Sequence, residues 1–256
     1  MVAFCALVPF ARIPSPRIEA FNPIFESTLA LNNLVTTSLL LVAFRRSRLR
    51  AVLCLASGYL FTALMAAPLL LTFPGVFSSS DPHAVDPQTS AWLDTFRNVG
   101  FPLFVICYAL LRRYDVATGR LHTGARASVI WAAAGVVAGT CLLSLVASAG
   151  YPLLPRLRLG DSYTTAMMAL NIPVCLTCFA AAILLASRPP YSILDLWLIV
   201  VVLAWMFDGA LSTVLNAGHS TSAFMPAAFA ACWLRASCRS FSLLRQAAFT
   251  AASIRP

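Results

Sequence analysis

Residues 58–104 read GYLFTALMAAPLLLTFPGVFSSSDPHAVDPQTSAWLDTFRNVGFPLF, and this stretch decides the fold class of the chain. An apolar helix is followed by the dipeptide Pro74-Gly75, a polar loop and a second apolar helix. A helix needs roughly 20 apolar residues to cross a bilayer, and the Pro-Gly dipeptide ends helices. The stretch therefore predicts a helical hairpin that crosses a membrane and returns.

Composition extends the membrane prediction to the whole chain. Of the 256 residues, 60% are hydrophobic and 11% are charged, whereas roughly a quarter of residues are charged in soluble domains. Every basic residue is an arginine, and the arginines gather in short clusters between apolar runs. Such clusters are typical of positive-inside topology and argue against a nucleic-acid surface. We expect a polytopic all-α bundle whose main partner is the lipid bilayer, and no nucleic acid.

Seven to eight spans are expected along the chain. Six are well defined, at about residues 25–44, 51–73, 91–111, 128–149, 163–186 and 193–217. Residues 1–11 have only about half the length of a span, so we expect them to be the outer half of a first helix whose beginning is missing. Residues 224–244 are apolar enough for an eighth span, but Arg235 and Arg239 interrupt them. The inner loops of this arrangement hold more than twice as many arginines as the outer loops, as orientation by the positive-inside rule requires.

A polar face inside the seventh span is the first candidate sensing site. Asp208 lies well within this span, and Trp205 and Asn216 share its broad helical face. A carboxylate that faces lipid is expensive, so we expect this face to point into the bundle. A ligand or proton site is one interpretation, and a structural hydrogen bond between helices or to water is the other.

Two further patterns are interpreted mainly as helix packing. Asn171, Cys175 and Cys178 share a face of the sixth span, and CLTC lacks the second cysteine pair or the nearby histidine that would complete a metal site. Gly135 and Gly139 form a GxxxG pattern, which lets helices approach closely. We also find no phosphate-binding loop or catalytic motif, so no metal, cofactor or catalytic residue is predicted.

The outer ends of two spans carry charged residues. Asp94 and Arg97 are three residues apart, so they share a helical face on which an ion pair would lower the cost of burial. Glu26 and Asn33 share a face of the second span. Both sets are candidates for lining an outward-facing pocket, and solvation at the membrane interface is the alternative.

Five motifs in a fixed order carry a resemblance to a known family. They are PFARIP at residues 9–14, LASGYLFTALM at 55–65, LTFPGVF at 71–77, PQTSAW at 87–92 and GFPLFVICYALLRR at 100–113. Together they resemble the fourth class of membrane-associated sensor domains of the MASE type, closely over residues 8–113 and more loosely to about residue 218.

The resemblance implies a sensor of the bacterial inner membrane that is not itself an enzyme. In such proteins the last helix leads into a cytoplasmic output module, most often a diguanylate cyclase of cyclic-di-GMP signalling and sometimes a histidine kinase. The implied partners are an unknown small ligand or membrane cue and, because output modules act in pairs, a second copy in a homodimer. A small-solute transporter or channel is the alternative function, but the inverted repeats typical of transporters are not seen.

The chain departs from the family pattern at the rim of the hairpin. Histidines are expected where this sequence has Leu69 and Asn98, so the rim is predicted to be a small-ligand or lipid-facing surface and not a metal site. The candidate residues of this rim are Pro74, Gly75, Gln88 and Trp92.

The end of the chain is the second departure. We expect residues 1–218 to be the sensor domain and residues 219–256 to be an atypical tail in place of the last helix. This tail is rich in Ser, Arg, Cys and Ala, and no GGDEF motif, kinase core or heptad pattern follows the seventh span. The output module is therefore expected to be missing and the tail to be read out of frame.

Overall fold

The computed structural model describes residues 21–72, 87–118, 125–149, 155, 157–159, 162–163, 165–187 and 192–216. All of them belong to one compact unit, which spans residues 19–218. The half-span expected at residues 1–11, the rim residues Pro74 and Gly75, and the tail from residue 219 lie outside the described residues.

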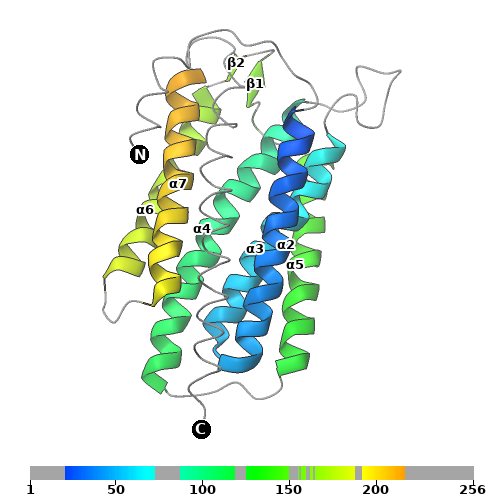
Figure 1. Cartoon of the computed structure of the whole chain (residues 1–256). Helices are drawn as coiled ribbons and strands as arrows, with labels where there is room; N and C mark the ends of the chain where they lie inside the picture. The colour runs from blue at the N-terminus through cyan, green and yellow to red at the C-terminus, as the bar shows by residue number, and fades with distance from the viewer. Residues whose placement is uncertain are drawn as a thin grey trace. The chain divides into compact units, whose positions relative to one another are not determined.

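Six α-helices make up almost all of the described part of this unit (Figure 1). They are α2 (Phe21–Ser47), α3 (Arg50–Leu71), α4 (Pro87–Thr118), α5 (Ala125–Ala149), α6 (Thr165–Ala186) and α7 (Ile193–Asn216). Each overlaps one of the six well-defined predicted spans, because long apolar runs bounded by arginine, proline and glycine leave the helix as the structure that satisfies the backbone in lipid. The prediction of an all-helical bundle is confirmed.

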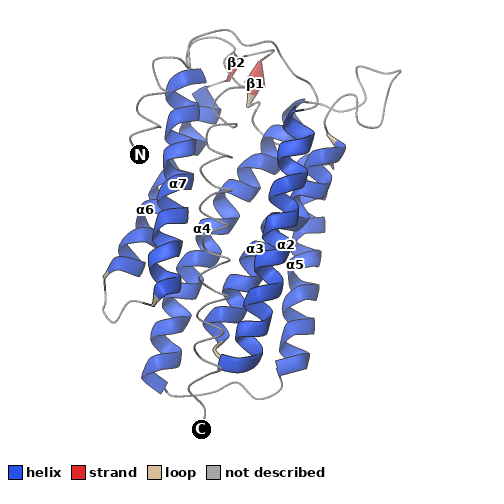
Figure 2. Cartoon of the chain, viewed as in Figure 1, coloured by secondary structure: helices blue, strands red, loops and turns tan. Residues whose placement is uncertain are grey.

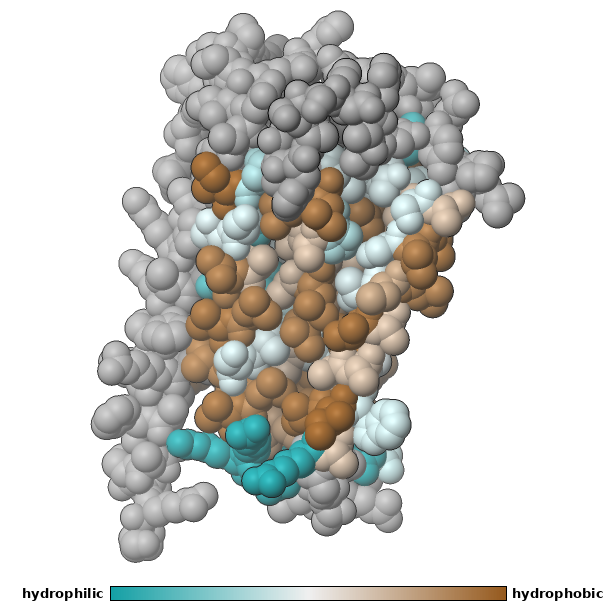
Figure 3. All heavy atoms as spheres, turned by 90° about the vertical axis from the view of Figure 1, so that its right-hand side faces the viewer, coloured by the Kyte–Doolittle hydropathy of each residue, from teal (hydrophilic) through white to brown (hydrophobic). Residues whose placement is uncertain are grey.

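Four of these helices meet the length and composition of a membrane span, namely α2, α3, α5 and α6. In α7, the shorter stretch Ile193–Phe207 is apolar. Helix α4 carries charged residues towards both of its ends. Apolar side chains cover much of the outside of the unit, and hydrophilic residues gather at one end (Figure 3). This distribution is that of a multi-pass membrane protein, in which lipid solvates the outer surface.

A short hairpin was not predicted. Strands β1 (Arg158–Leu159) and β2 (Ser162–Tyr163) pair antiparallel between α5 and α6 (Figure 2). Arg158 is opposite Tyr163 in the register, and Leu159 is opposite Ser162. The sequence between them is Gly-Asp, a dipeptide typical of two-residue hairpin connections, and this local signal was hidden in a segment interpreted as an irregular loop.

Helices α3 and α4 are in close contact because glycine lies where they meet. A Cβ atom placed on Gly58 would lie 2.7 Å from Cβ of Phe104, well inside the optimal carbon–carbon separation of about 3.5–4.0 Å. A Cβ atom on Gly100 would likewise clash with the ring of Phe61. Each helix therefore places a glycine against an aromatic residue of the other. Because these glycines have no side chain, the two backbones approach closely.

The GxxxG pattern of α5 behaves differently. No described atom lies within 4 Å of a Cβ placed on Gly135 or Gly139. Several large apolar residues on the same helix are exposed, including Trp131 at 77%. Among the described residues, no helix packs against this pattern, so the prediction that it lets helices approach closely stays a prediction.

These two environments give a first testable prediction. Replacing Gly58 by alanine is expected to lower the free energy of unfolding by about 1–3 kcal/mol, because the added methyl group overpacks the contact with Phe104. The matched control is Gly135→Ala, which is expected to be neutral or to stabilise α5 by up to about 1 kcal/mol, since alanine favours helix over glycine. Thermal unfolding in detergent measures both, and equal effects of the two substitutions would contradict the α3–α4 contact described here.

Candidate functional site

Helix α4 is the element that connects the rest of the unit. It contacts α3, α5, α6, α7 and β1, and its 32 residues extend over about 48 Å at 1.5 Å per residue. This exceeds the hydrocarbon thickness of about 30 Å, so both ends reach the polar interfaces. Each end carries a polar network, which we call the outer cluster (Glu26, Asp94, Arg97 and Asn98) and the inner cluster (Tyr108, Arg112 and Asp195).

In the outer cluster, one guanidinium joins two carboxylates. Arg97 donates through Nη1 to Oε2 of Glu26 on α2 at 2.5 Å and through Nη2 to Oδ1 of Asp94 at 2.6 Å. Asn98 Nδ2 donates to the second oxygen of Asp94 at 3.0 Å. The ion pair predicted between Asp94 and Arg97 is confirmed. The structure adds Glu26, which sequence analysis had placed in a separate set, and so ties α2 to α4.

The charges of the outer cluster are unequal and unequally exposed. The side chains of Arg97 and Glu26 are 12% and 8% exposed, whereas that of Asp94 is 37% exposed. Glu26 and Arg97 therefore form the buried pair, and Asp94 is the second carboxylate at its more open side. The cluster therefore holds two carboxylates for one guanidinium.

A polar stripe on α2 continues inward from the outer cluster. Asn33 is buried, and so is Thr37, whose hydroxyl donates to the backbone oxygen of Asn33 at 2.8 Å. The side-chain nitrogen of the neighbouring Asn32 is buried without a hydrogen-bond partner among the described residues. Buried polar groups are usually satisfied, so this stripe is a costly feature to retain inside a span.

Two of the predicted rim residues are buried. Gln88 Oε1 accepts a hydrogen bond from the backbone nitrogen of Leu157 at 2.8 Å, which ties the start of α4 to the segment before β1. Trp92 packs against Phe96, with the ring centroids 5.6 Å apart. At 7% and 8% exposure respectively, Gln88 and Trp92 act here as packing residues.

The candidate face of α7 points into the bundle at Trp205. Its ring lies 4.8 Å from that of Phe101 on α4, and Phe101 in turn meets Tyr59 of α3 edge-on at 5.1 Å. These three rings connect α3, α4 and α7 between the two clusters. Asp208 and Asn216 are in the same helix, and their side chains lie outside the described part of the structure.

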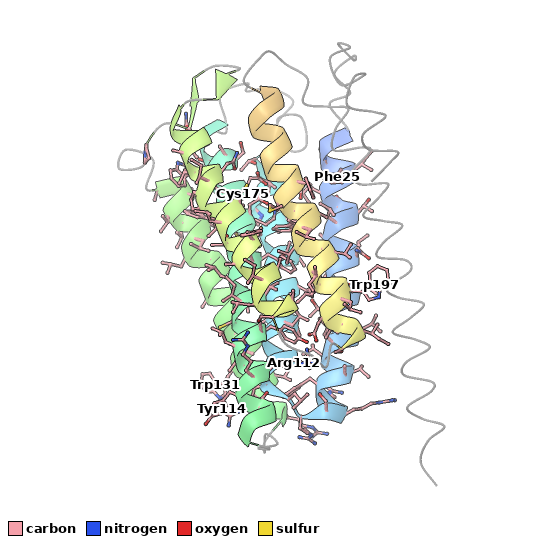
Figure 4. The ribbon with its side chains drawn as sticks, turned by 90° about the vertical axis from the view of Figure 1, so that its left-hand side faces the viewer. Phe25, Arg112, Tyr114, Trp131, Cys175 and Trp197 are labelled. Atoms are coloured by element: carbon pink, nitrogen blue, oxygen red, sulfur yellow. The ribbon has the colours of Figure 1, made fainter. Side chains whose placement is uncertain are left out.

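Helix α6 carries the remaining candidates. Asn171 is half-buried, and one turn later the sulfur of Cys175 lies 4.0 Å from the backbone oxygen of Met206 on α7. Cys178 is fully buried in the main apolar core. These contacts support the interpretation of this face as helix packing (Figure 4 labels Cys175). Within the described ranges, no group of three or more His, Cys, Asp or Glu residues is arranged to hold a metal ion.

The inner cluster was missed by sequence analysis. Asp195, in the first turn of α7, is 1% exposed and accepts a hydrogen bond from the hydroxyl of Tyr108 at 2.8 Å. It also forms an ion pair with Arg112, which extends between the helices near the inner end of the unit (Figure 4). Its second oxygen accepts from the backbone nitrogen of Ser192 at 2.8 Å. Asp195 therefore links the start of α7 to α4 through a hydrogen bond and an ion pair.

A local signal for part of this arrangement was present in the sequence. Ser192 and Asp195 have the spacing of a capping box, in which each side chain accepts a hydrogen bond from the backbone nitrogen of the other residue. The hydroxyl of Ser192 accepts from the backbone nitrogen of Leu194 at 3.2 Å, one residue earlier than in the full capping box. The motif predicts the backbone partner of Asp195 but carries no information about Tyr108 or Arg112 on α4.

The last turns of α4 also hold α3 and α6. Asp115 is 3% exposed and accepts from the backbone nitrogen of Ala51 at 3.2 Å, so it caps the start of α3, where no side chain of the preceding segment does so. A carboxylate at this position also matches the positive end of the helix dipole. Arg113 donates to Ser187 Oγ at 2.6 Å, at the end of α6. The inner end of α4 thus contacts three other helices through polar groups.

Exposed aromatic residues lie at the same end. Tyr114 on α4 is 50% exposed and Trp131 on α5 is 77% exposed, and Figure 4 shows both at the inner end of the unit. Tyrosine and tryptophan concentrate at membrane–water interfaces, and arginine concentrates on the cytoplasmic side. The exposed aromatic residues and the arginines at this end are the combination that is typical of a membrane–water interface.

Comparison with known proteins identifies the family. The family model MASE4, described as "Membrane-associated sensor, integral membrane domain", matches residues 16–227. No curated protein and no solved structure matches the chain. The match covers most of the sequence and confirms the resemblance carried by the five motifs. The chain belongs to the MASE4 family of integral membrane sensor domains.

Proposed function

We propose that this chain senses an extracytoplasmic or membrane-borne cue at the bacterial inner membrane and relays it to a cytoplasmic signalling module. The module would be a diguanylate cyclase, in which case the output is cyclic-di-GMP, or a histidine kinase. We further propose that the bundle has seven to eight spans, with the outer cluster facing the periplasm. The observation that carries the proposal is that α4 has charged networks at both ends, joined to different helices.

The relay would work through a displacement of α4. Arg97 and Arg112 are 15 residues apart in sequence, which corresponds to about 22 Å along the helix. A cue that weakens or strengthens the bond between Arg97 and Glu26 changes how α4 sits against α2. Because α4 runs as one helix from Arg97 past Pro102 to Arg112, the shift would alter how Arg112 meets Asp195, and so the position of α7. Such a cue acts by favouring one of two helix arrangements.

A chimera tests this function. A diguanylate cyclase module is fused behind Pro256 of the full chain, and cyclic-di-GMP is measured in a strain that makes none of its own. Asp94→Asn removes one charge at the more open side of the outer cluster and is expected to change the output at least threefold. The matched control is Leu142→Ala, which alters an exposed apolar position of α5 and is expected to leave the output unchanged.

The location of the fused module is checked first by protease protection in spheroplasts. An active, cytoplasmic cyclase whose output is the same in the parent, Asp94→Asn and Arg97→Gln chimeras would rule out the outer cluster as the sensing site. An output that changes equally in Leu142→Ala would show a general sensitivity to substitution and would also count against it.

A further inference from the structure

Two cysteines meet across the contact between α3 and α4. The side chains of Cys54 and Cys107 interact directly, and the sulfur of Cys54 also lies 3.7 Å from the backbone oxygen of Phe104. Both are free thiols. Cys54 is half-buried, and Cys107 is exposed on the outer surface of the bundle. The pair belongs to neither cluster.

The packing of the two helices explains why these thiols meet. Gly58 lies one turn after Cys54, and its close contact is Phe104, which lies one turn before Cys107. In two antiparallel helices, the residue one turn before a contact on one helix lies near the residue one turn after it on the other helix, and these two residues form the next layer of contacts. Disulfides require Cα atoms roughly 4.4–6.8 Å apart, and the glycine in this contact allows the two backbones to approach each other closely.

The position of the pair along the helices decides what can reach it. Cys54 lies four residues after the start of α3, about 6 Å from that end of the helix, and Cys107 lies 11 residues before the end of α4, about 16 Å from that end. Thiols near the cytoplasmic face are kept reduced by cellular thiols, and disulfides formed there are usually transient and sensory. Because Cys107 faces outward from an apolar part of the bundle, an oxidant reaches it through the lipid.

We propose that Cys54 and Cys107 form a reversible redox pair that is oxidised to a disulfide by a membrane-soluble quinone. In this step two S–H bonds break and one S–S bond forms. The two electrons and two protons pass to the quinone, which leaves as the hydroquinone. A cytoplasmic dithiol reverses the step by thiol–disulfide exchange, since attack on the disulfide returns both protein thiols and oxidises the dithiol.

The disulfide would link α3 to α4, the helix that contributes residues to both clusters. It would join α3 and α4 covalently in the inner half of the bundle and prevent α4 from sliding along α3. Cys175 and Cys178 offer a built-in comparison, because they lie in the same helix and a bond between them would leave α6 free to move. This inference goes beyond the proposed function, since the chemistry of the pair requires no output module.

The test uses the full chain in proteoliposomes that contain a short-chain ubiquinone. After incubation, free thiols are blocked with N-ethylmaleimide, and mass spectrometry quantifies the linked peptide pair that contains Cys54 and Cys107. We expect the linked fraction to rise at least tenfold over liposomes without quinone and to return to the starting level with dithiothreitol. Cys107→Ser should abolish the linkage, and the double substitution of Cys175 and Cys178 by serine should leave it intact.

Three results would overturn the proposal. The first is no linkage between Cys54 and Cys107 with quinone in the folded wild-type chain, a measurement that depends on no variant. The second is linkage with hydrogen peroxide in the water phase but not with quinone, which would exclude the lipid route. The third is an equal or larger quinone-dependent linkage between other cysteines, which would show general thiol oxidation.

Discussion

Replacing Asp195 by alanine is expected to destabilise the bundle by about 3–5 kcal/mol, the usual cost of removing one partner of a buried ion pair. The substitution removes the carboxylate that neutralises Arg112 and accepts the hydroxyl proton of Tyr108. After the substitution, Tyr108 stays buried at the contact between α4 and α7, and Arg112, whose side chain is 30% exposed, loses the carboxylate that neutralises it. The loss should appear as a lower midpoint of thermal unfolding in detergent.

Two companion variants give this prediction its controls. Tyr108→Phe removes one interhelical hydrogen bond and should cost only about 1 kcal/mol. Asp94→Ala removes a carboxylate that is 37% exposed and should cost at most about 1 kcal/mol, as exposed ion pairs do. An Asp195→Ala chain that unfolds with the same midpoint as the wild type, or as the Asp94→Ala variant, would contradict the inner cluster.

Replacing Arg97 by glutamine is the second prediction with a large effect. It removes the cation that joins Glu26 to Asp94 and leaves Glu26, whose side chain is 8% exposed, as a buried carboxylate without that partner. The expected loss is again about 3–5 kcal/mol of unfolding free energy. Because the ion pair between Glu26 and Arg97 connects α2 to α4, the variant should also make the part of the chain between these two helices more accessible to proteolysis.

A double-mutant cycle separates the ion pair from simple loss of packing. Glu26→Gln alone leaves Arg97 with one carboxylate, whereas Glu26→Gln with Arg97→Gln replaces the buried charges by two amides of similar size. The double variant should be more stable than Arg97→Gln alone, with a coupling energy of about 0.5–3 kcal/mol. Additive losses in the two single variants would show that the two side chains contribute independently.

Helix positions and one polar contact were predictable from local patterns. Long apolar runs between arginine clusters predict the six helices, because a backbone in lipid must satisfy its own hydrogen bonds. The spacing of three between Asp94 and Arg97 predicts their ion pair, since residues at that spacing lie on one helical face. The five family motifs predict the sensor class, because each motif is contiguous in sequence and can be recognised without knowledge of the tertiary structure.

Contacts between distant helices were not predictable in this way. Glu26 bonds Arg97 from 71 residues away, and Tyr108 bonds Asp195 from 87 residues away. The sequence shows which residues share a face of one helix, but not how that helix is rotated towards its neighbours. Several rotations bury a broadly apolar helix about equally well, so polar patterning alone leaves the partner undecided.

Close packing makes that choice. Gly58 and Gly135 are alike in sequence, since each is a glycine within an apolar helix, yet Gly58 meets Phe104 and Gly135 meets no described atom within 4 Å. What the sequence by itself determined is the number, approximate positions and class of the described helices, because these follow from hydrogen bonding within each segment. The tertiary structure alone decided which charges and thiols meet, because rotation and register depend on side chains from two helices fitting together.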